Sequence, residues 1–148
     1  MRFALALLLV LGCARHEPAA PPIEVASPAF NNGQTIPAKY TCAGANISPP
    51  LQWSGVPPSA KSLTLTVDDP DASGGHFTHW QVTQIPPTTT AIPEGGHVGS
   101  EATNGFGKPG WGGPCPPSGE HHYVFTLTAL DANGRAVGRG SLVGRFSK

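Results

Sequence analysis

The chain has 148 residues, which suits one domain, and its nine Lys and Arg balance its nine Asp and Glu. Balanced charge without basic clusters argues against nucleic acid as a partner. The 19 glycines and 17 prolines exclude a helical bundle or coiled coil, because both residues disfavour helices. Hydrophobic residues form 39% of the chain and occur in patterned runs, which predicts a folded, loop-rich, mostly β protein rather than a disordered one.

The N-terminal segment predicts a lipoprotein signal. Arg2 precedes an apolar run, residues 3–11, that is too short to span a bilayer but suits a signal peptide. The run ends in Val-Leu-Gly-Cys, which is similar to a bacterial lipobox and makes residues 1–12 the signal peptide and Cys13 the lipidated residue. The alternative is an ordinary signal peptide with a coincidental cysteine. Ala14 in place of Asp favours the outer membrane, with the protein facing the periplasm.

The rest of the chain divides into a tether and a domain. Residues 13–22 combine the lipidated cysteine with a Pro- and Ala-rich stretch that has no apolar period, as expected of an extended tether. The folded domain then covers residues 23–148. Lipid attachment through several acyl chains would hold it stably at the membrane of the cell envelope.

Alternating apolar and polar residues predict three strands in this domain. Leu63, Leu65 and Val67 alternate with Ser and Thr in residues 62–67, and aromatic and β-branched residues are frequent in 76–85. In residues 122–130, Tyr123 and Phe125 share one face with two further apolar residues. Residues 23–29 and 141–146 are shorter candidates. No window shows the 3.6-residue apolar period of a capped helix, so helix content is expected to be low.

Residues 86–120 contain seven prolines and nine glycines and lack a strand pattern. Loops this long are uncommon in compact domains and usually serve a function, and Phe106, Trp111 and Cys115 give this one hydrophobic anchors. With Cys13 taken by lipid, Cys42 and Cys115 remain as an even pair in an oxidising compartment. A disulfide between them is therefore expected, the alternative being two buried thiols.

Four short motifs occur in a fixed order along the domain. They are Asp-Pro-Asp-Ala at 69–72, His-Trp at 79–80, Gly-Pro-Cys-Pro-Pro at 113–117 and His-x-Tyr-x-Phe at 121–125. As a set they resemble the phosphatidylethanolamine-binding protein family, in particular its bacterial Raf-kinase-inhibitor-like branch, over about residues 30–131. The resemblance implies a large antiparallel sheet packed against a smaller one, with few short helices.

The resemblance also implies a small pocket for phosphate, acetate, cacodylate or a phosphoethanolamine head group. Carried over by position, the ligand-binding residues are Asp69, Pro70, His79, Gly113, Pro114, His121 and Tyr123. Imidazole and phenol groups can donate hydrogen bonds to an anion, and glycine amides can add a nest. The carboxylate would instead accept a hydrogen bond from one imidazole. Taken singly, the same residues also suit turn chemistry at a strand end or a core tyrosine.

Three departures from the family pattern bear on this pocket. Ser73 stands where proline is usual, and His122 replaces a common arginine, which removes a permanent charge. The helix that relatives place before the last strand is missing after Asp131, so one side of the site is expected to be more open.

The function predicted from these residues is non-enzymatic binding of a small anion or phospholipid head group, with no cofactor and no metal. Family members also inhibit kinases or serine proteases, so a protein partner is a further expectation of the resemblance. The alternative is a hydrolase that uses the same pocket. It would take Cys115 with His121 as a nucleophile pair, or a metal held by Asp69, His79 and His121. The disulfide would exclude the first of these.

Overall fold

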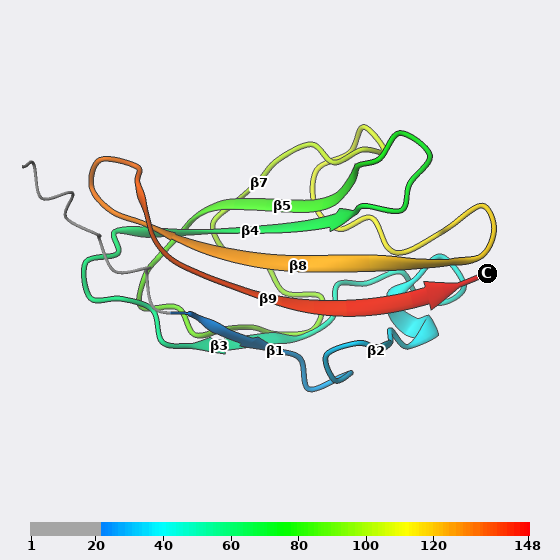
Figure 1. Ribbon diagram of the computed structural model, residues 1–148, viewed down its shortest axis with the longest axis horizontal. Helices are drawn as coiled ribbons and strands as arrows, with labels where there is room; N and C mark the ends of the chain where they lie inside the picture. Colours follow the sequence, from blue (N-terminus) through cyan, green and yellow to red (C-terminus); the bar gives the residue numbers. More distant parts are fainter. Residues whose placement is uncertain (1–21) are drawn as a thin grey trace, which may run out of the picture.

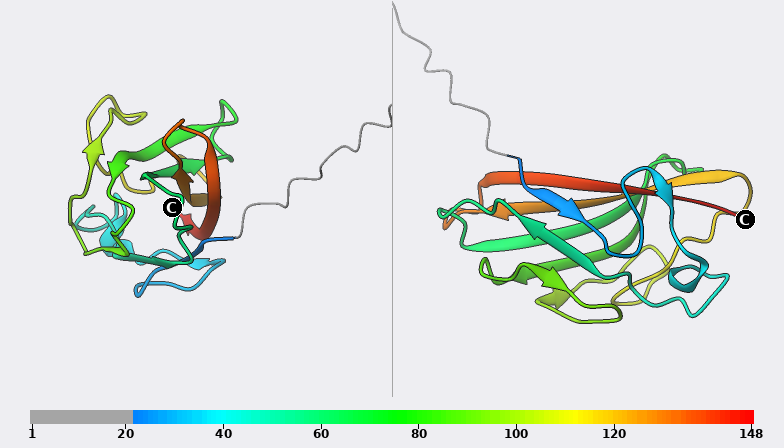
Figure 2. Two further views of the ribbon diagram at one scale, coloured as in Figure 1. Left: turned by 90° about the vertical axis from the view of Figure 1, so that its left-hand side faces the viewer. Right: turned by 90° about the horizontal axis from the view of Figure 1, so that it is seen from below.

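Two β-sheets packed against each other make up the part of the protein that the computed structural model describes, residues 22–148 (Figures 1 and 2). The predicted signal peptide, the lipidated Cys13 and the tether up to residue 21 lie outside these residues. Within residues 22–148, no helix has the length and apolar character that a membrane span requires.

The large sheet has six strands in the order β2-β9-β8-β4-β5-β7. In chain order they are β2 (Gln34–Thr35), β4 (Ser62–Asp69), β5 (Phe77–Ile85), β7 (Ser100–Glu101), β8 (Glu120–Leu130) and β9 (Ala136–Ser147). All neighbouring strands are antiparallel except the short edge pair of β2 and β9, which is parallel. The small sheet has the order β1-β3-β6, with strands β1 (Glu24–Ala26), β3 (Leu51–Ser54) and β6 (Ala91–Ile92). A single 3₁₀ turn, η1 (Ala38–Tyr40), is the only helical element among the described residues.

The hydrophobic core lies between the two sheets, and the period-two pattern of the sequence decides which side chains enter it. In β4, Leu63, Leu65 and Val67 are fully buried while the residues between them are half-buried. In β8, Tyr123 and Phe125 begin a buried row that continues along the strand, since alternate side chains point to one face. The alternation in 62–67 and 122–130 therefore predicted both strands correctly.

The end of the chain confirms that the helix is missing. Strand β8 turns directly into β9 at Asp131, whose side chain accepts the backbone N–H groups of Asn133 and Arg135. Strand β9 begins at residue 136, five residues before the predicted strand at 141–146. At Gly144 in β9 a Cβ atom would overlap core side chains of Ile36 and Phe30, so only glycine fits there.

Four short strands were not predicted from the sequence, and one strand is shorter than predicted. Strands β2, β6 and β7 have two residues each, too few to show any period, and β3 has four. The predicted strand at 23–29 is reduced to β1, residues 24–26. Residues 86–120 otherwise form an ordered loop, as predicted, and its last part returns to the end of the sheet where β8 begins (Figure 1).

Candidate functional site

Three strands of the large sheet contribute polar side chains to one cavity of about 190 Å³, which we call the histidine cavity. The end of β4 supplies Asp69, the start of β5 supplies His79, and the start of β8 supplies His121 and Tyr123. The full lining is Asp69, Ala72, Ser73, Phe77, His79, Phe106, Cys115, Pro116, Pro117, His121 and Tyr123.

Strand parity explains how Asp69 and Tyr123 reach the cavity. Asp69 follows the buried residues of β4 at an interval of two, so its carboxylate points to the core face just where the core ends. Tyr123 does the same at the start of the buried row of β8. In both strands, the face that supplies apolar side chains to the core therefore supplies a polar side chain to the cavity at its end.

A β-bulge explains the position of His79. Val67 pairs with Trp80 and Asp68 with Thr78, so His79 is an extra residue without a partner in β4. Consequently His79 and Trp80, although adjacent, are both buried. The bulge turns the imidazole of His79 toward the cavity while the indole of Trp80 remains in the core.

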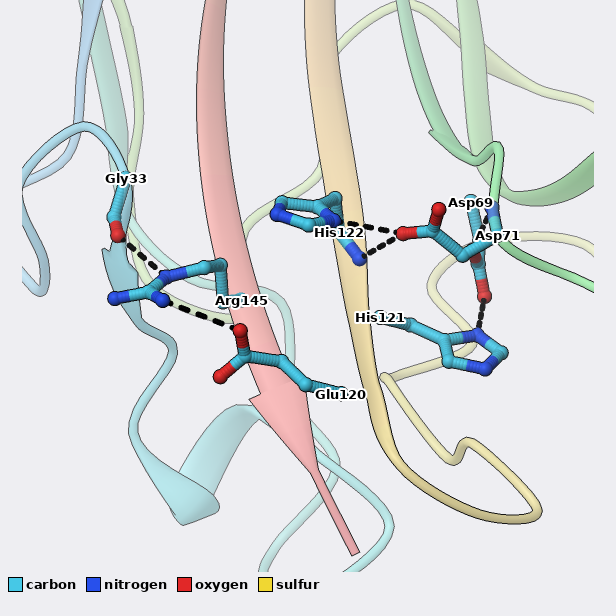
Figure 3. Close-up of polar contacts among 7 residues, drawn as sticks. All are labelled: Gly33, Asp69, Asp71, Glu120, His121, His122 and Arg145. Atoms are coloured by element: carbon cyan, nitrogen blue, oxygen red, sulfur yellow. Dashed lines mark hydrogen bonds and ion pairs between the residues drawn. The ribbon is translucent and has the colours of Figure 1, made fainter.

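His121 and Asp69 form a largely buried pair (Figure 3). The Nδ1 atom of His121 lies 2.7 Å from Oδ2 of Asp69, whose other oxygen accepts the backbone N–H of Asp71 at 2.8 Å. The side chains are 12% and 5% exposed. Asp69 therefore fixes the ring with its Nδ1–H toward the carboxylate, which leaves Nε2 as the nitrogen that can contact a ligand.

His79 is held in the corresponding way by the loop. Its Nδ1 atom lies 2.6 Å from the carbonyl oxygen of Gly112 and donates to it, so Nε2 is again the remaining ring nitrogen. Burial lowers the pKa of His79 below its ordinary value of 6.5, because the imidazolium form loses its hydration, although the Gly112 carbonyl opposes this. The ring packs edge-on against Tyr123 and Phe77, with centroids 5.0 Å apart in both pairs.

Tyr123 contributes a hydroxyl group that has no hydrogen-bond partner among the described residues, although it is buried. Burial is the main cause that raises the pKa of this phenol, with a further contribution from the charge of Asp69. The group therefore remains an O–H donor at any physiological pH. It is the unsatisfied polar group of the site.

The Gly-Pro-Cys-Pro-Pro segment forms one wall, although not with all the residues expected. Cys115, Pro116 and Pro117 line the cavity, whereas Gly113 and Pro114 are buried behind it and Pro70 lies exposed outside it. The predicted glycine nest is also occupied: Gly112 N–H donates to the carbonyl of His79, and Gly113 N–H to Asn46 Oδ1 at 2.9 Å. These two amides are not available to an anion.

The predicted disulfide between Cys42 and Cys115 is present and joins this wall to the segment after η1. It leaves no thiol in the cavity. Among residues 22–148, no cluster of three His, Cys, Asp or Glu side chains has a geometry suited to a metal ion.

A second His-Asp pair lies outside the cavity (Figure 3). Asp71 accepts both the backbone N–H and the ring Nδ1 of His122, at 2.8 and 2.7 Å. These hydrogen bonds, the backbone one first, lower the pKa of Asp71. His122, which replaces the common arginine, thus ties the loop after β4 to β8. Sequence reasoning missed this contact and missed Phe77 as a lining residue, since neither a lone histidine nor a strand phenylalanine carries a specific signal.

Known proteins are similar to this chain in sequence. The sequence model of the phosphatidylethanolamine-binding protein family matches residues 26–147. A UPF0098 protein of Methanothermobacter thermautotrophicus is 50% identical over 110 residues, which cover 70% of this chain and 73% of that protein. The "Putative lipoprotein LppC" of Mycobacterium tuberculosis is 49% identical over 120 residues, 76% of this chain but only 58% of the relative.

Two solved structures share the fold. A phosphatidylethanolamine-binding protein homologue of Chlamydia trachomatis superposes with a TM-score of 0.81 at 34% identity, covering 86% of this chain and 98% of that one. YbcL of E. coli, described as a new member of the mammalian PEBP family, superposes with a TM-score of 0.79 at 29% identity, covering 86% of this chain and 99% of that one.

Proposed function

The chain belongs to the phosphatidylethanolamine-binding protein family, and from this premise we propose that its histidine cavity binds a phosphate group, free or on an organic head group such as phosphoethanolamine. One observation carries the proposal: among residues 22–148 the buried hydroxyl of Tyr123 finds no partner, in a cavity that also presents His79 and His121. Burying such a group unpaired costs about 1–3 kcal/mol. An oxyanion that accepts its hydrogen bond would recover this cost.

The donors of the cavity suit a tetrahedral oxyanion. Tyr123 offers O–H, and the Nε2 atom of His121 offers a further N–H when the ring carries both protons. His79, which is neutral at pH 7 because its pKa is lowered, can accept a hydrogen bond from the P–O–H group of a hydrogenphosphate through Nε2, or take up a proton on binding. Asp69 also lines the cavity, but both its oxygens accept hydrogen bonds, from His121 and from the Asp71 amide, and these donors offset part of its charge.

Binding without catalysis is the role that these residues support. The disulfide between Cys42 and Cys115 removes the thiol that a cysteine hydrolase would need. The metal-dependent alternative makes a separate expectation: protein purified without added metal would contain a stoichiometric ion. We propose the binding role because the histidines are fixed by Asp69 and Gly112 rather than by each other or by a nucleophile.

We further propose that the protein acts at the cell envelope. The lipobox-like sequence around Cys13 would supply the anchor, with residues 1–12 removed and residues 13–22 as tether before the domain 23–148. The lipoprotein named among the relatives supports envelope association. The placement at the outer membrane, facing the periplasm, rests on Ala14 alone.

Titration with inorganic phosphate and with phosphoethanolamine tests the cavity. We expect saturable NMR shifts at His79, His121 and Tyr123, and loss of binding in His79→Ala and His121→Ala. His97→Ala is the matched control, because His97 is an exposed histidine that does not line the cavity, and it should bind within twofold of the wild type. Unchanged affinity in both cavity variants, each shown to be folded, would refute the assignment.

A further inference from the structure

A second cavity of about 300 Å³, which we call the tryptophan cavity, adjoins the histidine cavity. Phe106 and Cys115 line both. The backbone of Gly112, which lines the tryptophan cavity, is also hydrogen-bonded to His79 of the histidine cavity, so the two cavities lie side by side. Trp111 and Lys108 belong to the tryptophan cavity alone.

Phe106 is an unusual dividing wall. The residue is 50% exposed and is the one large hydrophobic residue left exposed in residues 22–148. The ring packs against Phe77 and His79, with centroid distances of 4.8 and 5.5 Å. It also lies over Gly112, where a Cβ atom would overlap it. The fold thus holds an apolar ring in water between two cavities, a position that a ligand spanning both would cover.

The lining of the tryptophan cavity indicates what such a ligand carries there. The indole N–H of Trp111 donates to the carbonyl of Tyr40 at 3.1 Å, which fixes the ring as a wall. The side-chain amide of buried Asn104 already has hydrogen-bond partners. It donates to the carbonyl of Gly110 and accepts from the backbone N–H of Phe106. The charged side chain of the lining is that of Lys108, and no lining residue is acidic.

We propose that the ligand is a phosphate monoester whose organic group is flat and apolar, and that this group occupies the tryptophan cavity while the phosphate occupies the histidine cavity. The inference rests on the proposed function. An aromatic group would cover Phe106 and stack near Trp111, whereas an ammonium group would meet Lys108 and find no carboxylate. Phe106 is then a residue that determines specificity.

Three probes test this on the full chain: inorganic phosphate, phosphoethanolamine and phenyl phosphate, compared by calorimetry at one pH. We expect phenyl phosphate to bind on the order of tenfold more tightly than inorganic phosphate, because it buries the aromatic ring. Phosphoethanolamine should not exceed inorganic phosphate. Intermolecular NOEs between the phenyl protons and the Trp111 indole should appear in the wild type, which makes the test independent of any variant.

Two variants localise the effect. Phe106→Ala should reduce the preference for phenyl phosphate over inorganic phosphate at least threefold. Lys108→Glu should shift the preference toward phosphoethanolamine, and Lys61→Glu, at an exposed lysine outside both cavities, should not.

The outcomes separate the two proposals. If none of the probes binds, the proposed function is wrong and this inference falls with it. If phosphate binds but phenyl phosphate binds no better, or binds without contacts to Trp111, the phosphate site stands and the role of the tryptophan cavity is refuted.

Discussion

Replacing Tyr123 by Phe should make the protein more stable and a poorer binder. The substitution removes only the hydroxyl, which is buried and has no hydrogen-bond partner in the part of the chain that the structure describes. A buried polar group without a partner costs about 1–3 kcal/mol, so the free energy of unfolding of the ligand-free protein should rise by about 1–2 kcal/mol. For a domain of this size that corresponds to roughly 4 °C in Tm per kcal/mol. Hydrogen bonds to charged groups contribute about 1.5–3 kcal/mol, so phosphate affinity should fall at least about tenfold.

Urea unfolding with and without saturating phosphate measures both effects. Tyr40→Phe is the matched control with the opposite sign, because the Tyr40 hydroxyl donates to Glu94 Oε2 at 2.7 Å and its loss should lower the free energy of unfolding. If Tyr123→Phe is as destabilising as Tyr40→Phe, the Tyr123 hydroxyl is satisfied in the folded protein. If phosphate affinity is unchanged, the hydroxyl is not a ligand donor, and the main support for the anion site is lost.

Three further expectations concern the fold. Because the folded-state pKa of His79 is lowered from 6.5, the unfolded chain takes up a proton at this residue first as the pH falls. The free energy of unfolding should therefore be at its full value above pH 6.5 and decline below it. The His79→Asn variant should show a flatter decline in urea unfolding. Replacing Cys42 and Cys115 by Ala removes a disulfide with a sequence separation of 73 and should lower the free energy of unfolding by about 4 kcal/mol in the same assay. A decrease under about 1 kcal/mol would contradict this, as would a variant whose stability falls on adding reductant as much as that of the wild type. Gly144→Ala should destabilise by about 1–3 kcal/mol because its Cβ overlaps core side chains, whereas Gly74→Ala, with open space around it, should be within about 0.5 kcal/mol of the wild type in thermal melts.

The strands that carry the core were predictable from the sequence, since their periods are long enough to be visible. Leu63, Leu65 and Val67 and the row that begins at Tyr123 alternate over whole strands, and burial of one face of a sheet imposes such a pattern. The two-residue edge strands were not predictable in this way. They exist because β9, β5 and β3 offer them unpaired backbone groups, and that depends on the assembled sheets.

The site divides along the same line. Asp69, His79, His121 and Tyr123 were named from the sequence because the ordered set of motifs resembles the family, and the parity of β4 and β8 explains why two of them, Asp69 and Tyr123, reach one end of the sheet. Only the tertiary structure decided the rest: the bulge that turns His79 inward, and the half-exposed ring of Phe106 between two cavities. Alternation is a local property of the chain and is written in the sequence. A bulge and a shared wall arise from contacts between segments tens of residues apart, and no local pattern records them.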